Sequence, residues 1–437
     1  MFLRINTRLV PSNRSHSLRH VSALIALAFG TAFAHAQAST LTLNEALQLS
    51  LQRSSLPKAA EAAVQASREA AVKAGQLPDP MLKVGIENLP VNGADRWSTT
   101  QDFMTMRRVG IEQQWVSSDK RAARSDRAQR AVESEEGNYL ADVAKVREET
   151  AKAWVTVLYA QRSLALVKAL EQQSVADLTA VQASHRGAKA TAGDVVQAQL
   201  AVTQTRDAVR KRELELQNAK LALSRWTTTP VETVSDQTPI LESRVPHLSI
   251  EDLEKYHPAV LAARRAITLA DAETTVATKE RRPDWSIEAG FSQRPHFSNM
   301  ISVGVSIPIT VNPSQRQDRD IAERSAMGTR ARLQYEDAVR GMQTEIRTLA
   351  STLSSQRERL ARLKSELLPA ASQQTELATA AYRAGTGSLS AVFSARKTQL
   401  EQQLQIAELE KDAALIWAKL EHQVVPHELA SVAKAQQ

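Results

Sequence analysis

Three long stretches without proline restrict the fold of this chain more than any other feature of its sequence. Proline is absent from Val91 to Thr229, from Ser314 to Leu368 and from Ala370 to Val425. Apolar residues recur within these stretches at the spacing of one helix face, which favours long amphipathic helices. If residues 119–184 form one helix, it is roughly 100 Å long. Such a rod must pack against others, because alone it would expose its apolar stripe.

The composition supports a helical fold and excludes several kinds of site. The 437 residues include 14 Gly, 15 Pro and 4% aromatic residues, which is typical of chains dominated by long helices. The sequence has no cysteine. This excludes disulfides, thiolate metal ligands and a lipid-modified N-terminal cysteine.

Residues 1–36 have the pattern of a secretory signal peptide. Four arginines precede an apolar run from Val21 to Phe33, and the cleavage-site pattern A-H-A follows at 34–36. The run has 13 residues, fewer than the roughly 20 that span a bilayer. We therefore expect an exported protein. Because these residues hold no acidic side chain, they supply part of the net charge of +7, and a nucleic-acid partner has little support.

Four short segments interrupt the helical pattern with an alternation of apolar and small or polar side chains. They are MLKVGIENL at 81–89, RVGIEQQWV at 108–116, DWSIEAGFS at 284–292 and MISVGVSIP at 300–308. The alternation predicts four β-strands in two hairpins. Their length suits a tilted strand that crosses a membrane. A soluble sheet capped by helices is the alternative, and four matched segments in an exported helical chain argue against it.

Four strands are too few for a membrane barrel made by one chain. A four-stranded sheet cannot close, and an open edge is not tolerated in lipid. Two chains would give eight strands with a filled interior, whereas three would give twelve and leave a lumen. The sequence thus predicts a mainly α fold with a small membrane β part, in which a trimer completes a twelve-stranded barrel.

The order of elements occurs twice along the chain. TLTLNEAL at 40–47 matches HLSIEDLE at 247–254, and each has a hydroxyl residue three positions before an acid, which is capping-box spacing. In each half a strand pair, a long helix, a small-residue interruption and a returning helix follow. We divide the chain into a signal peptide at 1–36, a first repeat at 37–240, a second repeat at 241–425 and a C-terminal tail at 426–437.

The two small-residue interruptions are expected to reverse the direction of the long helices. They are HRGAKATAGDVVQA at 185–198 and YRAGTGSLSAVFSA at 382–395. A tight reversal needs residues that adopt a positive φ or have little side-chain bulk. The residues expected to serve these turns are Gly187, Gly193, Gly385, Gly387 and Ser388. The alternative is that each glycine only ends a helix.

The duplicated layout, the PDPML-to-VGI hairpin region and the two turn motifs resemble the TolC-like outer membrane efflux proteins from about Leu41 to Val424. LPDPMLKVGIENLP at 77–90 and DFMTMRRVGIEQQW at 102–115 look most like the heavy-metal branch of resistance-nodulation-division systems, with its CzcC- and CusC-like components. The resemblance implies a TolC-like α/β-barrel: a homotrimer in the outer membrane, extended into the periplasm by a hollow helical barrel. It implies that the helical turns dock a periplasmic adaptor (membrane fusion) protein, and that an inner-membrane pump is the second partner.

The function implied by the resemblance is passive conduction of substrate from pump and adaptor to the exterior. Heavy-metal cations such as copper, silver, cobalt, zinc or cadmium are the expected cargo. Channels for drug efflux and for type I protein secretion share this architecture and remain alternatives. A periplasmic coiled-coil adaptor or scaffold is a more remote alternative, because it should not carry four alternating strands.

Asp194 is the candidate for a carboxylate at the pore entrance. Members of the resembling family with a charged constriction carry carboxylates just after the second turn, where this chain has Ala391 and Ser394. We therefore expect no second acidic ring. The alternative for Asp194 is that it only caps the returning helix.

No motif supports catalysis, a cofactor or a bound metal. H-E-x-x-H, G-x-x-x-x-G-K-[ST] and G-x-S-x-G are absent from the sequence. Met104, Met106 and His296 are expected in loops without a cluster of ligands around them. Basic residues after the second and fourth strands are expected on solvated helix faces, or alternatively near lipid headgroups. They are Lys120, Arg121, Arg124, Arg127, Arg130, Arg316, Arg319 and Arg324.

Overall fold

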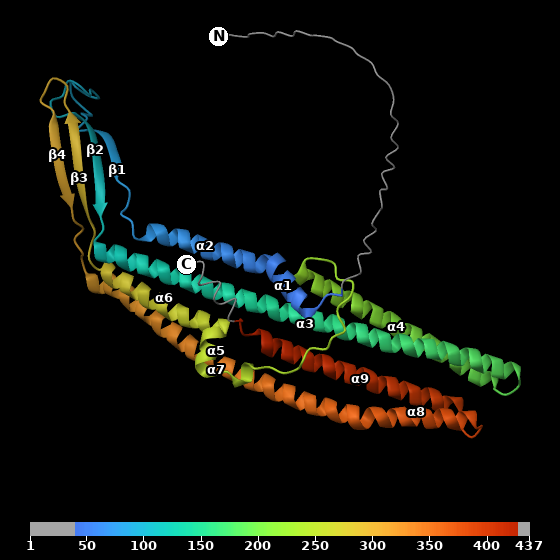
Figure 1. Ribbon diagram of the computed structural model, residues 1–437. Helices are drawn as coiled ribbons and strands as arrows, with labels where there is room; N and C mark the ends of the chain where they lie inside the picture. Colours follow the sequence, from blue (N-terminus) through green and yellow to red (C-terminus); the bar gives the residue numbers. More distant parts are fainter. Residues whose placement is uncertain (1–39, 427–437) are drawn as a thin grey trace, which may run out of the picture. The chain divides into compact units, whose positions relative to one another are not determined.

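Helices make up most of residues 40–426, which are the residues that the computed structural model describes (Figure 1). The predicted signal peptide lies outside this range, as do residues 427–437. No helix within residues 40–426 is both long enough and apolar enough to cross a bilayer. The mainly α class with one small sheet, predicted from the sequence, is confirmed.

Each half of the chain supplies two shorter helices, two strands and a long helical hairpin. The first half contains α1 (Leu43–Arg53), α2 (Ser55–Ala74), β1 (Met81–Glu87), β2 (Met106–Trp115), α3 (Ser118–Arg186) and α4 (Ala192–Thr227). The second half contains α5 (Ile250–Tyr256), α6 (Pro258–Glu280), β3 (Trp285–Gln293), β4 (Met300–Ser306), α7 (Gln317–Arg362), α8 (Leu368–Arg383) and α9 (Leu389–His422). Single turns lie at η1 (Val245–His247), η2 (Pro313–Gln315) and η3 (Leu363–Leu367). With 69 residues, α3 extends over about 100 Å.

Both halves begin with a capped helix, as the hydroxyl-acid spacing predicts. At α1 the Glu45 carboxylate accepts from the Thr42 amide at 2.9 Å, and Thr42 Oγ1 accepts from the Glu45 amide at 3.3 Å. At α5 Ser249 Oγ accepts from the Asp252 amide at 3.1 Å, and its hydroxyl donates to the Asp252 carboxylate at 3.0 Å. These bonds satisfy amides at helix starts that have no partner within the helix.

The long helix of the second half changes pitch just before Pro369. It ends as α7 at Arg362, makes the π turn η3, and continues as α8 with the proline in its first turn. A proline within a helix lacks an amide hydrogen and clashes with the carbonyl group four residues earlier. One wide turn at this point accommodates the ring while the helix continues to the second hairpin turn.

The four strands form one antiparallel sheet in the order β1-β2-β3-β4. Their bounds differ from the predicted ones by one or two residues. β2 of the first half pairs with β3 of the second, so that Gly110 lies opposite Gly290 and Trp115 opposite Trp285. β1 and β4 are therefore the edges of the sheet, and each half of the chain supplies one edge.

The centre of α3 lies in the core that joins the two halves. Trp154 is 1% exposed and packs in one cluster with Leu223 of α4. Its indole nitrogen donates a hydrogen bond to the Leu41 carbonyl at 2.8 Å. Ala151, one turn earlier on α3, belongs to a second cluster with residues of α7 and α9, such as Trp417. The same stretch of α3 thus binds helices from both halves.

Two basic residues at the start of α3 pair with acids of the second half. Lys120 is 4% exposed, and its ammonium group lies 2.6 Å from the Asp284 carboxylate, directly before β3. Arg124 binds Glu280 of α6 at 3.1 Å. The expectation of a solvated face is therefore wrong for Lys120, because the pairing of β2 with β3 brings Asp284 beside it.

Replacing Trp154 by alanine should destabilise the protein by roughly 3–5 kcal/mol, because it leaves a cavity and removes the donor to Leu41. The midpoint of thermal unfolding, followed by circular dichroism in detergent, measures this loss. Trp226→Ala is the control, since Trp226 is only half-buried and its ring lies under Arg225. Equal losses for the two variants would contradict the role of Trp154 in the core.

Candidate functional site

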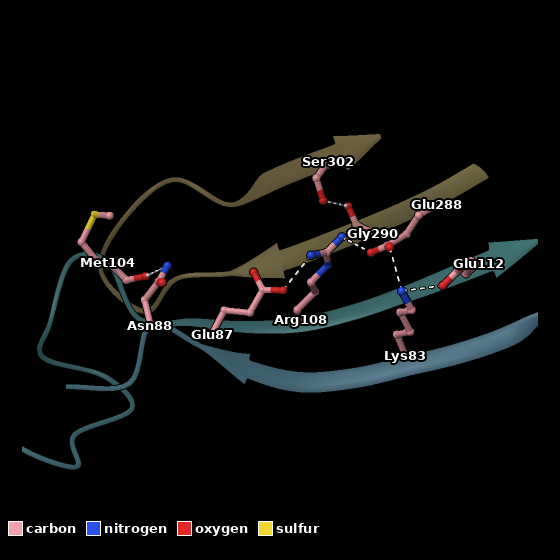
Figure 2. Close-up of polar contacts among 9 residues, drawn as sticks. All are labelled: Lys83, Glu87, Asn88, Met104, Arg108, Glu112, Glu288, Gly290 and Ser302. Carbon is pink, nitrogen blue, oxygen red and sulfur yellow. Dashed lines mark hydrogen bonds and ion pairs between the residues drawn. The ribbon is translucent and has the colours of Figure 1, made fainter. Parts of the chain in front are cut away.

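One face of the sheet carries a network of charged side chains (Figure 2). It consists of Lys83, Glu87, Arg108, Glu112 and Glu288, at alternate positions of β1, β2 and β3. The Lys83 ammonium group lies 2.5 Å from the Glu112 carboxylate and 2.9 Å from that of Glu288. The Arg108 guanidinium binds Glu87 at 2.6 Å and also contacts Glu288. The ion pairs therefore connect three strands from both halves of the chain.

The opposite face of the sheet is apolar and exposed. Ile301 is 81% exposed and Val84 is 72% exposed. The same face carries Leu82, Ile86, Val109, Ile111, Val303 and Val305, all of them exposed. A continuous apolar patch of this kind is typical of a surface that contacts lipid or protein. Trp115 and Trp285, which stack with ring centroids 5.8 Å apart, lie at the strand ends next to the helices.

Glycine makes room for the Arg108 side chain on the charged face. A Cβ at position 290 would lie 2.8 Å from Arg108 Nε and 3.2 Å from one terminal guanidinium nitrogen. A Cβ at Gly110, opposite Gly290, would lie 3.0 Å from the Ala289 carbonyl oxygen. Because position 290 lacks a side chain, the guanidinium can lie along the sheet toward Glu288 (Figure 2), whereas Gly110 relieves a contact with the backbone of β3.

The first helical turn, between α3 and α4, obtains its left-handed residue from Ala188, whose φ is 55°. The amide of Lys189 closes the turn on the Ser184 carbonyl at 2.8 Å. A Cβ at Gly187 or Gly193 would meet no atom closer than 3.5 Å. The turn geometry therefore requires neither glycine, contrary to the expectation from the sequence, because Ala188 supplies the positive φ.

Asp194 caps α4, as one of the two alternatives for this residue predicts. Its carboxylate accepts from the Thr191 amide at 2.9 Å and from the Thr191 hydroxyl at 2.8 Å, and its own amide donates to Thr191 Oγ1 at 3.1 Å. The Thr191 amide, and after it the hydroxyl, lower the pKa of Asp194. A carboxylate with a lowered pKa is ionised at neutral pH, as an unperturbed aspartate also is, so capping does not preclude an electrostatic role.

The second turn, between α8 and α9, depends on its glycines. Gly385 has a φ of 76°. A Cβ at Gly387 would lie 3.0 Å from Ala381 Cβ and 3.1 Å from the Ala381 carbonyl carbon. Ser388 caps α9 by accepting from the Ala391 amide at 3.2 Å. Because Ala391 stands where the first turn has Asp194, no carboxylate completes this cap.

The two turns pack against each other at one end of the helices (Figure 1). Val181 of α3, Ala198 of α4 and Leu389 of α9 form a buried cluster between them. Arg396 of α9 makes an ion pair with Asp177 of α3. The residues expected to dock a partner are thereby brought to one end, while the charged network lies in the sheet at the opposite end (Figure 1).

The three residues considered as metal ligands do not all lie in loops. Met104 lies in the β1–β2 loop and His296 in the β3–β4 loop, whereas Met106 begins β2 and is not a loop residue. Within residues 40–426, no group of three or more His, Asp or Glu side chains is arranged to hold a metal ion.

Sequence patterns alone did not identify the charged network as a site. A signal for it is nevertheless present, because K-x-G-x-E at 83–87 and R-x-G-x-E at 108–112 repeat around a glycine, and E-x-G follows at 288–290. In a strand this spacing places every charged residue and the glycine on the same face. The pattern does not predict which distant strands pair with each other.

Comparison with known proteins supports an efflux channel. Residues 249–423 match the family described as outer membrane efflux protein. The chain is 25% identical over 379 residues to the cobalt-zinc-cadmium resistance protein CzcC of Cupriavidus metallidurans, a match that covers 85% of this chain and 87% of CzcC. The resemblance predicted from the sequence is thereby confirmed.

Solved structures of two channels share the fold. CusC matches with a TM-score of 0.73 and 16% identity, over 86% of this chain and 90% of that one. The CmeC outer membrane channel of Campylobacter jejuni matches with a TM-score of 0.75 and 13% identity, over 90% of this chain and 88% of that one.

Gly385→Ala should destabilise the second turn by about 1–2 kcal/mol, because alanine is strained at a φ of 76°. Gly193→Ala is the matched control and should stabilise the start of α4 by about 0.5–1 kcal/mol, because a helical position with free space favours alanine. Amide hydrogen exchange, measured by mass spectrometry at the two turns, should become faster in the first variant and slower in the second. Slower exchange in Gly385→Ala would contradict the turn geometry described above.

Proposed function

We propose that three copies of this chain form an outer membrane channel for metal cations, because residues 249–423 match the outer membrane efflux protein family and residues 40–426 share the fold of CusC and CmeC. A periplasmic adaptor and an inner-membrane pump of the resistance-nodulation-division type deliver the cations. Conduction through the channel is passive, the pump supplies the energy, and the chain catalyses no reaction.

The observation that carries this proposal is a sheet with one apolar face, one charged face and two open edges. In a bilayer the backbone groups at both edges need partners. Pairing β1 of one copy with β4 of the next supplies them. Three copies then surround a lumen with twelve strands, whereas eight strands from two copies would enclose an interior filled by side chains.

The metal cargo is supported by the similarity to CzcC, which extends over 85% of this chain. The name of that protein connects it with cobalt, zinc and cadmium, and the resemblance adds copper and silver as candidates. The fold by itself does not identify the cargo, because CusC and CmeC are only 16% and 13% identical to this chain and share its architecture alone. A drug-efflux channel or a protein-secretion channel would differ from the proposed metal channel in its pump and its cargo.

We place adaptor docking at the two helical turns, on the residues Gly187, Gly193, Gly385, Gly387 and Ser388. All of them except Gly387 are exposed, and the packing of the two turns against each other presents them together. Small residues allow a partner to approach the backbone closely. Asp194, whose carboxylate caps α4 in its ionised form, is the proposed carboxylate at the pore entrance.

The proposal includes the division of the chain into repeats at 37–240 and 241–425, followed by a tail at 426–437. Each repeat contributes one β-hairpin to the barrel and one helical hairpin to the periplasmic part. Export of the chain depends on residues 1–36 as a signal peptide, and the absence of cysteine means that no lipid is attached through one.

Deletion of this gene should make cells more sensitive to salts of at least one of cobalt, zinc, cadmium, copper or silver, because the cations could no longer leave through the outer membrane. Minimal inhibitory concentrations measure the effect, with re-expression of the intact chain as the control.

Outer-membrane fractions should contain a trimer that dissociates on heating in a gel. A soluble periplasmic monomer would contradict the channel, and unchanged tolerance in a strain without similar channels would contradict the metal cargo.

Gly187→Gln should weaken adaptor binding by about tenfold, because it adds bulk in a proposed contact. Site-specific cross-linking to the adaptor in cells measures binding. Gly341→Gln is the control, since Gly341 is exposed on α7 away from the turns and a Cβ there meets no atom within 4 Å. Equal cross-linking in both variants would place the docking surface elsewhere.

A further inference from the structure

The charged face of the sheet has more acidic than basic side chains. Within β1 to β4 its charged residues are Glu87, Glu112 and Glu288 against Lys83 and Arg108. Each chain therefore contributes a net charge of about −1 on this face, and three chains about −3. Arg107 alternates onto the other face, where its guanidinium donates to Thr99 in the β1–β2 loop at 3.2 Å.

Each of three charged residues lies opposite a glycine of the neighbouring strand. Lys83 pairs with Gly110, Arg108 with Gly85 and Glu288 with Gly304 in the register of the sheet. A Cβ at Gly85 or Gly304 would meet nothing within 4 Å. The space above Gly85 and Gly304 is therefore open, and no bulky side chain stands at these positions to obstruct a lumen.

The ion pairs fix the positions of the charged groups, and some of these groups have two partners each. Lys83 bridges Glu112 and Glu288, and Glu288 contacts Arg108 as well as Lys83 (Figure 2). No carboxylate of the network is left without a cationic partner. A passing cation therefore meets a net negative potential, but meets no pair of free carboxylates that could chelate it.

We propose that these five residues, Lys83, Glu87, Arg108, Glu112 and Glu288, form an ion-selectivity belt that favours cations over anions in the lumen without retaining them. This inference rests on the proposed function, because the belt acts only where the charged face lines a pore. Its field extends over a Debye length, which is about 10 Å at 0.1 M salt and about 3 Å at 1 M. Selectivity should therefore weaken as the salt concentration rises.

Two substitutions that change the net charge of the belt in opposite directions test it. Arg108→Gln makes its net charge more negative, from about −1 to about −2 per chain, and Glu288→Gln makes it about zero. The purified trimer is inserted in a planar lipid bilayer with a KCl gradient, and the K⁺ to Cl⁻ permeability ratio is obtained from the reversal potential. The ratio should rise roughly two- to fourfold in Arg108→Gln and fall by a similar factor in Glu288→Gln, because counter-ion concentration follows fixed charge.

Arg107→Gln is the matched control, since it removes the same charge from the adjacent residue on the opposite face. Its permeability ratio should equal that of the unmodified channel. Conducting channels whose ratio does not change in Arg108→Gln and Glu288→Gln would overturn the belt and leave the channel proposal intact. Ratios that shift in the same direction in both variants would also overturn it, because distortion of the sheet would then be the cause. An unmodified trimer that forms no channel would overturn the proposed function itself.

Discussion

The open edges of β1 and β4 are the constraint on which the rest of the structure depends. A strand edge presents backbone N–H and C=O groups, and hydrocarbon offers them no partner. The order β1-β2-β3-β4 places one strand of each half at an edge, and in the proposed trimer β1 of one copy pairs with β4 of the next. The positions of the long helices depend on the positions of the strands, because α3 begins three residues after β2 and α7 follows β4. In the proposed trimer, the pairing of edge strands therefore also sets which helices of neighbouring copies meet.

The two halves repeat one architecture but differ at their turns. The first turn takes its left-handed residue from Ala188 and the second from Gly385. Asp194 completes the cap of α4 with an ionised carboxylate, whereas Ala391 leaves the cap of α9 to Ser388 alone. The turns share a shape because a reversal of two packed helices needs a short connection at both sites. They differ in charge, which makes the two positions unequal for any partner or ion.

The glycines of this chain serve different physical purposes, and their spacing does not reveal which. Gly385 is needed for its positive φ, while Gly290 is needed because the Arg108 guanidinium occupies the space of its side chain. Gly187 and Gly193 are needed for neither purpose. In the sheet, Gly290 allows the long Arg108 side chain to lie flat, which keeps it out of the open interior that the proposed channel requires.

The sequence by itself determined the elements of this protein. Stretches without proline predicted the long helices, alternation predicted the four strands to within two residues, and the hydroxyl-acid spacing predicted the caps at Thr42 and Ser249. These features depend on neighbours a few residues away, so local patterns contain them. The changed pitch before Pro369 is local as well, although the sequence did not indicate a π turn.

Only the tertiary structure decided which distant side chains meet. Lys120 with Asp284, Arg108 with Glu288 and Trp154 with Leu41 are contacts between residues far apart in the chain. Alternation assigns a residue to a face of the sheet, but the register between β2 and β3 selects its partner across the sheet. That register depends on the packing of whole helices and strands from both halves, and no short stretch of sequence carries this information.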